Sequence, residues 1–198
     1  ILSRNTPPTN DLAVMLVSGD TNWVTLPPSV MIPAGQTNTT VPVASLNDGI
    51  NITPSSSHIV ILGNLIGTDY SGAVAIGNSN NGFVIQPGSS FDEIGDGTTA
   101  GRNIISGNNQ SGIFVNGTDS VSINKNYIGL GIDGSTALGN SSYGISLAND
   151  HASQVIDNVV SSSGAEGLFV NLGSDRIIDG NRIGTDATGN ASIPNGGA

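Results

Sequence analysis

The chain has 198 residues, of which 36% are apolar and 28 are glycine, so it can form one ordinary domain or two small ones. Fifteen acidic against five basic residues give a formal net charge of −10, which excludes binding to the phosphate backbone of nucleic acid. No apolar run approaches the ~20 residues of a membrane-spanning helix, which excludes membrane insertion by a helix. Abundant Gly, Asn, Ser and Thr disfavour helices and favour short strands between tight turns.

Residues 1–50 differ from the rest of the chain in being rich in proline. Within them, "DLAVMLVSGD" and "TTVPVASLND" alternate apolar and polar residues, as half-buried strands do. We therefore predict a small β-sandwich-like segment over 1–50, with a boundary in "NDGINITPSSS". Trp23 is interpreted as a core residue of this segment rather than as a platform for a sugar.

Residues 51–198 contain internal repeats. The phrase "NLIGTD" at 64–69 returns as "NYIGLG" at 126–131 and "NRIGTD" at 181–186. Long units alternate with short units of 23 residues, and short apolar patches such as "GFVI" and "GIFV" follow a glycine. About 23 residues form one coil of a parallel β-helix, with three short strands and three turns. We predict an all-β fold, a right-handed parallel β-helix of about four to five coils. The alternative is an antiparallel sandwich, which does not explain fixed repeat offsets.

An asparagine followed by two or three residues, most of them branched and apolar, opens every unit. Asparagine tolerates the left-handed bend of a coil corner, and its amide can hydrogen-bond to the amides above and below it. We therefore predict a structural ladder at one corner; a ligand-binding surface made of the same residues is the alternative. The predicted ladder consists of Asn64, Asn103, Asn126, Asn158 and Asn181.

Extra residues in the long units are expected to project as loops on one face, where repeat proteins commonly bind ligands. Each loop carries one aspartate, namely Asp69, Asp133 or Asp186. These are the candidate Ca²⁺ ligands, because Ca²⁺ prefers hard oxygen atoms. Capping of the loop's own backbone is the simpler interpretation, since Ca²⁺ needs six or more oxygens. No other cofactor is predicted.

The stretch "EIGDGTTAGRNIISGNNQSGIFVNGTDSVSINKNYIGLGIDGSTALGN" resembles the tandem right-handed parallel β-helix repeats of large secreted bacterial and archaeal surface proteins. This resemblance extends over about residues 59–198 and implies an extracellular or cell-surface location. Residues 11–49 resemble the later strands of a Calx-β or Ig-like module. They lack the acidic segment expected after "NDG", so calcium binding does not carry over from that family.

Polysaccharide-cutting β-helix proteins need clustered carboxylates or bound calcium beside a base, and the repeats show no such cluster. No catalytic residue is therefore predicted. His58 and His151 lack partners for a metal site or a triad, so they are assigned to packing or solvent. Asp175 and Arg176 are expected to form a surface ion pair. Packing is favoured over sugar stacking for the three tyrosines Tyr70, Tyr127 and Tyr143.

Six N-glycosylation sequons also occur, and they matter only if the source organism glycosylates surface proteins. The sequons lie at Asn38, Asn51, Asn109, Asn116, Asn140 and Asn190.

Three functions remain open. The leading one is a non-enzymatic extracellular structural protein that self-associates into a cell-surface filament, by end-to-end stacking or strand complementation. It fits the C-terminal "IPNGGA", which ends part-way through a coil without a polar cap. The second is a carbohydrate-binding or adhesive module that contacts surface glycans through its loops, and the third is a polysaccharide lyase or hydrolase. The chain does not begin with Met, so we expect a mature product or a fragment.

Overall fold

The computed structural model describes residues 49–196 and, before them, only 2–3, 12–15, 24–25, 29–32, 34, 38–39 and 44–45. The chain divides into two compact units, 1–47 and 48–198. Three short antiparallel strand pairs are described in the first unit: β1 (Leu2–Ser3) with β5 (Asn38–Thr39), β2 (Leu12–Met15) with β4 (Ser29–Ile32), and β3 (Val24–Thr25) with β6 (Ala44–Ser45). The predicted sandwich and Trp23 lie outside the described residues.

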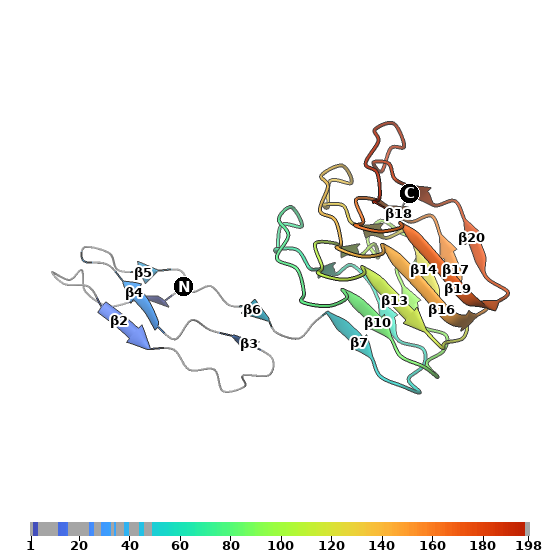
Figure 1. Ribbon diagram of the computed structural model, residues 1–198, viewed down its shortest axis with the longest axis horizontal. Coiled ribbons are helices and arrows are strands. Elements are labelled where there is room, and N and C mark those ends of the chain that lie inside the picture. Colours follow the sequence, from blue (N-terminus) through green and yellow to red (C-terminus); the bar gives the residue numbers. More distant parts are fainter. Residues whose placement is uncertain are drawn as a thin grey trace. The chain divides into compact units, whose positions relative to one another are not determined.

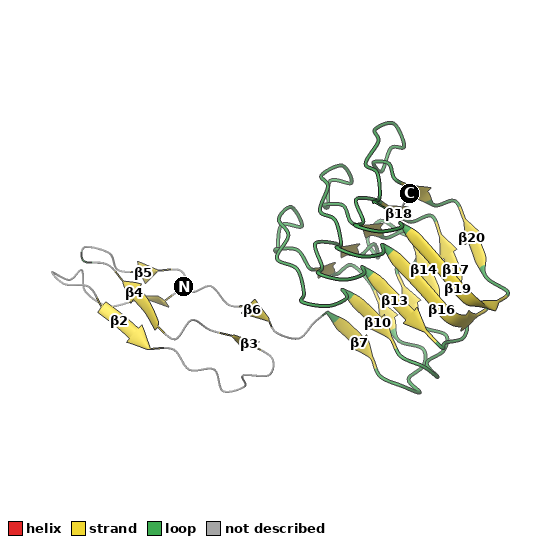
Figure 2. Cartoon of the chain, in the orientation of Figure 1, coloured by secondary structure: helices red, strands yellow, loops and turns green. Residues whose placement is uncertain are grey.

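Three parallel sheets of five strands each make up the second unit (Figures 1 and 2). The first sheet contains β7 (Ile50–Ile52), β10 (Phe83–Ile85), β13 (Ile113–Asn116), β16 (Ile145–His151) and β19 (Leu168–Ser174). The second contains β8 (Val60–Ile61), β11 (Glu93–Ile94), β14 (Ser122–Asn124), β17 (Gln154–Ile156) and β20 (Ile177–Asp179). The third contains β9 (Leu65–Ile66), β12 (Ile104–Ile105), β15 (Tyr127–Ile128), β18 (Val159–Val160) and β21 (Arg182–Ile183).

Each turn of the chain supplies one strand to each sheet, and we call such a turn a coil. Five coils follow one another from β7–β9 to β19–β21, an arrangement compatible with a parallel β-helix. The prediction of an all-β chain built from stacked parallel strands is confirmed for this unit. The described residues contain no helix long and apolar enough to cross a membrane.

The core consists of columns of branched side chains that share one position on successive coils. In the second sheet Ile94 and Ile123 are fully buried, and the parallel register aligns them with one another. In the third sheet the inward column is Ile66, Ile105, Ile128, Val160 and Ile183. Full burial of such a side chain contributes ~1.5–3 kcal/mol. The strands can therefore be short, because neighbouring coils provide the buried area.

The long coils form loops over 67–77, 129–139 and 184–194. Antiparallel bridges close these loops, as between Leu130 and Ala137. A Cβ added to the tip residue Gly134 would lie 2.9 Å from the Tyr127 ring, so this loop leans over the outer face of the third sheet. A packed layer is ~10 Å thick, whereas neighbouring strands are ~4.8 Å apart. One loop can therefore cover two coils, which explains why long and short coils alternate.

Candidate functional site

The five asparagines that open the units lie one above another at the corner before the third sheet. The backbone N–H and Nδ2 of Asn103 donate to Oδ1 of Asn126 at 3.1 and 2.9 Å. Asn126 donates in the same way to Asn158, and its Nδ2 also reaches the Ile94 carbonyl at 2.7 Å. Asn64, at the start, and Asn181, at the end, join the series through equivalent bonds. The three central asparagines are 0% exposed, so their amides are used inside the fold.

A second asparagine ladder lies at the corner before the first sheet. Asn78 donates through its backbone N–H and Nδ2 to Asn108, and Asn108 donates likewise to Asn140. Ser163 takes the next position, and its N–H donates to Asn195. This ladder was not predicted, although the constant offset of Asn78 and Asn140 in the sequence is a visible signal. Asn140 is 1% exposed and bonded, so a glycan on its sequon is incompatible with this fold.

Glycines before the first-sheet strands make space for the second ladder. A Cβ on Gly82 would lie 2.6 Å from Nδ2 of Asn108, and a Cβ on Gly112 would lie 2.8 Å from Nδ2 of Asn140. A Cβ on Gly167 would likewise meet Nδ2 of Asn195, whereas a Cβ on Gly144 would meet Val160 and the Gly167 carbonyl. Close contact, in three of these four cases with an amide, thus explains the glycine that precedes each of these strands.

The three loop aspartates cap the backbone of their own loops. Asp133 accepts hydrogen bonds from the N–H groups of Ser135 and Thr136 at 3.0 and 2.9 Å, and from both hydroxyls. These bonds hold the pKa of Asp133 far below its usual range. Asp69 and Asp186 accept similar bonds from their own loops. Among the described residues no three His, Cys, Asp or Glu side chains group as metal ligands would.

A buried polar corner joins the first and second sheets. Asp150, which is 0% exposed, accepts hydrogen bonds from Nε and Nη2 of Arg176 at 2.7 and 2.5 Å. The expected surface pair of Asp175 with Arg176 is therefore wrong; Asp175 instead accepts from the Ser174 hydroxyl. No sequence pattern predicts the contact between Asp150 and Arg176, because the two residues lie on different coils, 26 residues apart.

Four oxygens of this corner are buried without a hydrogen-bond partner in the structure: Asp92 Oδ2, Thr118 Oγ1, Asp150 Oδ2 and Ser153 Oγ. Burial raises the pKa of Asp92, although the N–H of Ile59 and the nearby His58 act in the opposite direction. The corner differs from the two asparagine ladders in that these four buried oxygens have no hydrogen-bond partner.

The two histidines lie at the same corner of the first and fourth coils and have separate neighbours. The His58 ring stacks on Phe91 with 5.3 Å between centroids, and His151 Nδ1 lies 3.1 Å from the Ser174 hydroxyl.

The three tyrosines differ in exposure and in the residues that they contact. Tyr70 is 95% exposed, Tyr127 lies under the Arg102 guanidinium, and Tyr143 stacks on Phe169.

The remaining sequons lie on the surface or outside the described side chains. Asn51, Asn109 and Asn190 are exposed, and Asn116 is half-buried and accepts from Asn149. Only the backbone of Asn38, in β5, is described.

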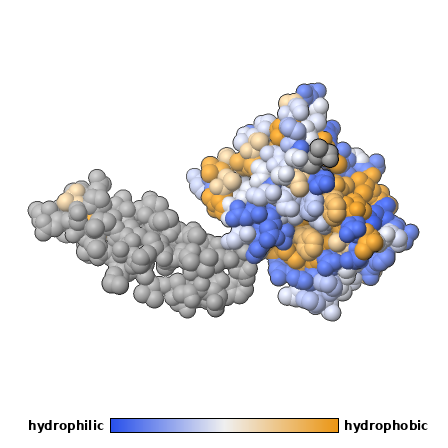
Figure 3. All heavy atoms as spheres, in the orientation of Figure 1, coloured by the Kyte–Doolittle hydropathy of each residue, from blue (hydrophilic) through white to orange (hydrophobic). Residues whose placement is uncertain are grey.

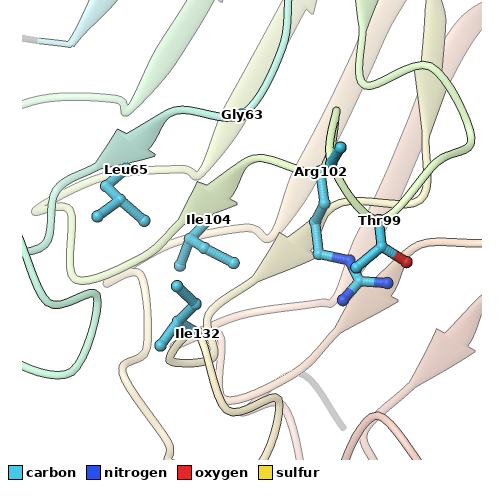
Figure 4. Close-up of a pocket in the computed structure, with 7 residues that line it drawn as sticks. Gly63, Leu65, Thr99, Arg102, Ile104 and Ile132 are labelled. Atoms are coloured by element: carbon cyan, nitrogen blue, oxygen red, sulfur yellow. The ribbon is translucent and has the colours of Figure 1, made fainter.

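A cavity of about 290 Å³ lies between the third sheet and the loop of the third coil. Figure 4 shows Leu65, Ile104 and Ile132 gathered on one side, with Arg102 and Thr99 on the other. The Arg102 guanidinium lies 3.9 Å from the centroid of the Tyr127 ring, and its Nε donates to a main-chain carbonyl. This lining offers one cation beside apolar walls and no carboxylate, so it lacks a general acid–base pair.

The fifth coil presents inward-type side chains that no other described coil covers. Val170, Ile178 and Ile183 are 42%, 45% and 47% exposed. Their equivalents one coil earlier, Leu147, Val155 and Val160, are 0%, 1% and 1% exposed. Among the described strands, none pairs with the free edges of β19, β20 and β21.

Comparisons with known proteins identified no relative: no family model matches the chain, and neither a curated protein nor a solved structure matches it.

Proposed function

We propose that this chain is a non-enzymatic extracellular structural protein whose coils continue onto a second copy, so that copies join into a cell-surface filament. We also propose that the coils are right-handed and that they are related to the β-helix repeats of secreted surface proteins. The observation that carries it is the uncovered fifth coil. Each of its three inward-type side chains is nearly half exposed, whereas the same position one coil earlier is buried.

The first asparagine ladder gives the assembly a direction. Each asparagine donates to the one on the following coil, so Asn181 has a backbone N–H that points to a further coil. At the opposite end, no described residue donates to Oδ1 of Asn64. A bond from Asn181 of one copy to Asn64 of the next would repeat the bond between Asn158 and Asn181, which is 2.9 Å long.

The two ends of the coiled unit contribute different surfaces. The fifth coil offers apolar side chains and strand edges, while in the first coil Ile52 and Ile66 are only 5% and 6% exposed. The first coil therefore contributes mainly its strand edges and Asn64. A contact between two different surfaces does not form a symmetric dimer, and it builds a filament when successive copies continue along one axis, as stacked coils do. Parallel strand addition supplies the main-chain hydrogen bonds.

Sedimentation velocity and negative-stain microscopy of the full chain test this proposal. The parent protein is expected to form long assemblies as its concentration rises. A variant with Ile178→Asp and Ile183→Asp is expected to stay monomeric, because two desolvated charges would oppose the contact. The matched control is Ile132→Asp, which changes a 55% exposed loop residue and should assemble like the parent. A strictly monomeric parent, or a double variant that assembles equally well, would overturn the proposal.

A further inference from the structure

The outer face of the first sheet carries a second cavity, of about 270 Å³, which the filament contact does not use. It is lined by residues of the second, third and fourth coils: Asn81, Gln110, Ser111, Phe114, Ser142, Tyr143 and Ser146. Figure 3 shows hydrophobic residues gathered on the face over β10 and β13, bordered by hydrophilic ones. The cavity therefore combines apolar and polar walls.

Three aromatic rings provide the apolar part of this face. Tyr143 and Phe169 are stacked, with ring centroids 4.6 Å apart and planes at 18°. Phe114 lines the same cavity, and all three rings are half-buried. Ser146, between Phe114 and Phe169 in the strand register, is 2% exposed. The rings thus form a wall across the third to fifth coils, and flat ring faces suit a ligand with flat apolar C–H surfaces.

Neutral amide and hydroxyl groups provide the polar part. Asn81 uses Oδ1 to accept from the Ser111 N–H, and no described residue accepts a hydrogen bond from its Nδ2. Gln110 uses Nε2 to donate to Asn80, which leaves its Oε1 available among the described contacts. The hydroxyl of Ser142 has no partner in the described structure. Donors and acceptors therefore stand beside the aromatic wall, and none of the lining residues carries a charge.

We propose that this cavity binds a neutral oligosaccharide. Such a ligand has apolar C–H faces that stack on rings and hydroxyl groups that pair with amides. An acidic polysaccharide fits poorly, because the lining holds no cation and the chain has a net charge of −10. The bound chain lies across the coils, with sugar faces on Tyr143 and Phe114 and hydroxyls towards Gln110 and Asn81.

Isothermal titration of the full chain tests the proposal with short neutral oligosaccharides of glucose, mannose and N-acetylglucosamine, and with oligogalacturonate as the acidic comparison. At least one neutral series is expected to bind, and oligogalacturonate is not. Tyr143→Ala is expected to weaken binding about 3–10-fold through loss of the stack. Gln110→Ala, at an exposed side chain, should weaken it about 2–10-fold through loss of a hydrogen bond.

Two controls separate binding from folding. Tyr70→Ala removes the 95% exposed tyrosine on a loop and should leave binding unchanged. Tyr143→Phe keeps the ring and should bind within about 3-fold of the parent, because only a hydroxyl is lost. Circular dichroism confirms that each variant is folded. Binding of no neutral series, binding of oligogalacturonate alone, or equal binding by folded Tyr143→Ala and Gln110→Ala variants would overturn the proposal. Loss of filament formation in the earlier experiment would not affect it.

Discussion

At the scale of single residues, asparagine holds this fold together because one side chain connects three coils. Asn126 accepts two hydrogen bonds from Asn103, donates to Asn158 and reaches a carbonyl of the second sheet through the same amide. No apolar residue could satisfy these groups, and a buried backbone N–H without a partner is costly. The asparagine therefore recurs in the sequence because each corner needs its hydrogen bonds.

Asn126→Ala is expected to lower the free energy of unfolding by about 3 kcal/mol, since several buried hydrogen bonds lose a partner. The matched variant is Asn64→Ala at the exposed first position, which should cost about 1 kcal/mol or less. Urea denaturation of both variants measures the difference. Equal losses would show that the bonds of the buried amide do not stabilise the stack.

Asp92 gives a prediction about pH. Because burial raises its pKa in the folded state, folding favours the protonated form. Its contribution to stability is present below the unfolded pKa and is lost as pH rises through the folded pKa. Asp92→Asn keeps the acceptor for the Ile59 N–H and removes the charge. The variant is expected to melt at a higher temperature than the parent at pH 7. The difference between the two melting temperatures should narrow towards about pH 3, where Asp92 is protonated in both states. A difference in melting temperature that stays constant from pH 7 to about pH 3, or a variant that is less stable than the parent at pH 7, would contradict a raised pKa of Asp92.

At the scale of elements, the repeating structural unit is a pair of coils. In the short coils the hydroxyls of Ser106 and Ser161 donate to the carbonyls of Leu130 and Thr185, which begin the loops of the following long coils. The loops also join one another, since the N–H of Ile132 donates to the carbonyl of Gly72. The projecting loops expected to bind ligands thus form a second packed layer on the third sheet.

The second ladder contains a gap that can be filled. Ser163 stands where the other coils have asparagine, and its Oγ is buried without a partner. Ser163→Asn would place an amide between Asn140 and Asn195, and Gly144 leaves the space that such an amide occupies on other coils. We expect the variant to gain about 1 kcal/mol in unfolding free energy. Ser141→Asn, at an exposed position, is the control and should change little. A loss of stability in Ser163→Asn would show that the niche is closed.

The stacked parallel strands could be predicted because identical residues recur where identical corners are needed. The opening asparagine and the isoleucine or valine two residues later indicate a corner and an inward column on every coil. Contacts that occur only once could not be predicted, because no repeat in the sequence indicates them. The Asp150–Arg176 pair forms only once, and it is possible because Gly173 on the fifth coil leaves space beside Arg176. The aromatic wall was likewise hidden, since Tyr143 and Phe169 meet only through the parallel register.

At the scale of the whole molecule, stability and assembly rest on the same contact between neighbouring coils. Stability of a stacked repeat is approximately a sum of unit and interface contributions, so a coil that lacks one neighbour loses part of its interface energy. The fifth coil is in this position, and the register of the second sheet specifies how a further coil would fit. Ile177 would lie opposite Val60 of a second copy, as Gln154 lies opposite Ile177.

A disulfide between two copies tests this contact most directly, because the parent chain has no cysteine. One preparation carries Ile177→Cys and another Val60→Cys, at positions that are 50% and 55% exposed. Paired strands lie ~4.8 Å apart, within the Cα separation that a disulfide spans. Mild oxidation of the mixture is expected to give a covalent dimer of the two variants, seen by mass spectrometry. In the control, the Ile177→Cys variant is mixed with an Ile132→Cys variant, and this mixture should give no covalent dimer of the two variants. Failure of the Ile177–Val60 pair to cross-link, or equal cross-linking in the control, would contradict the continuation of coils from one copy to the next.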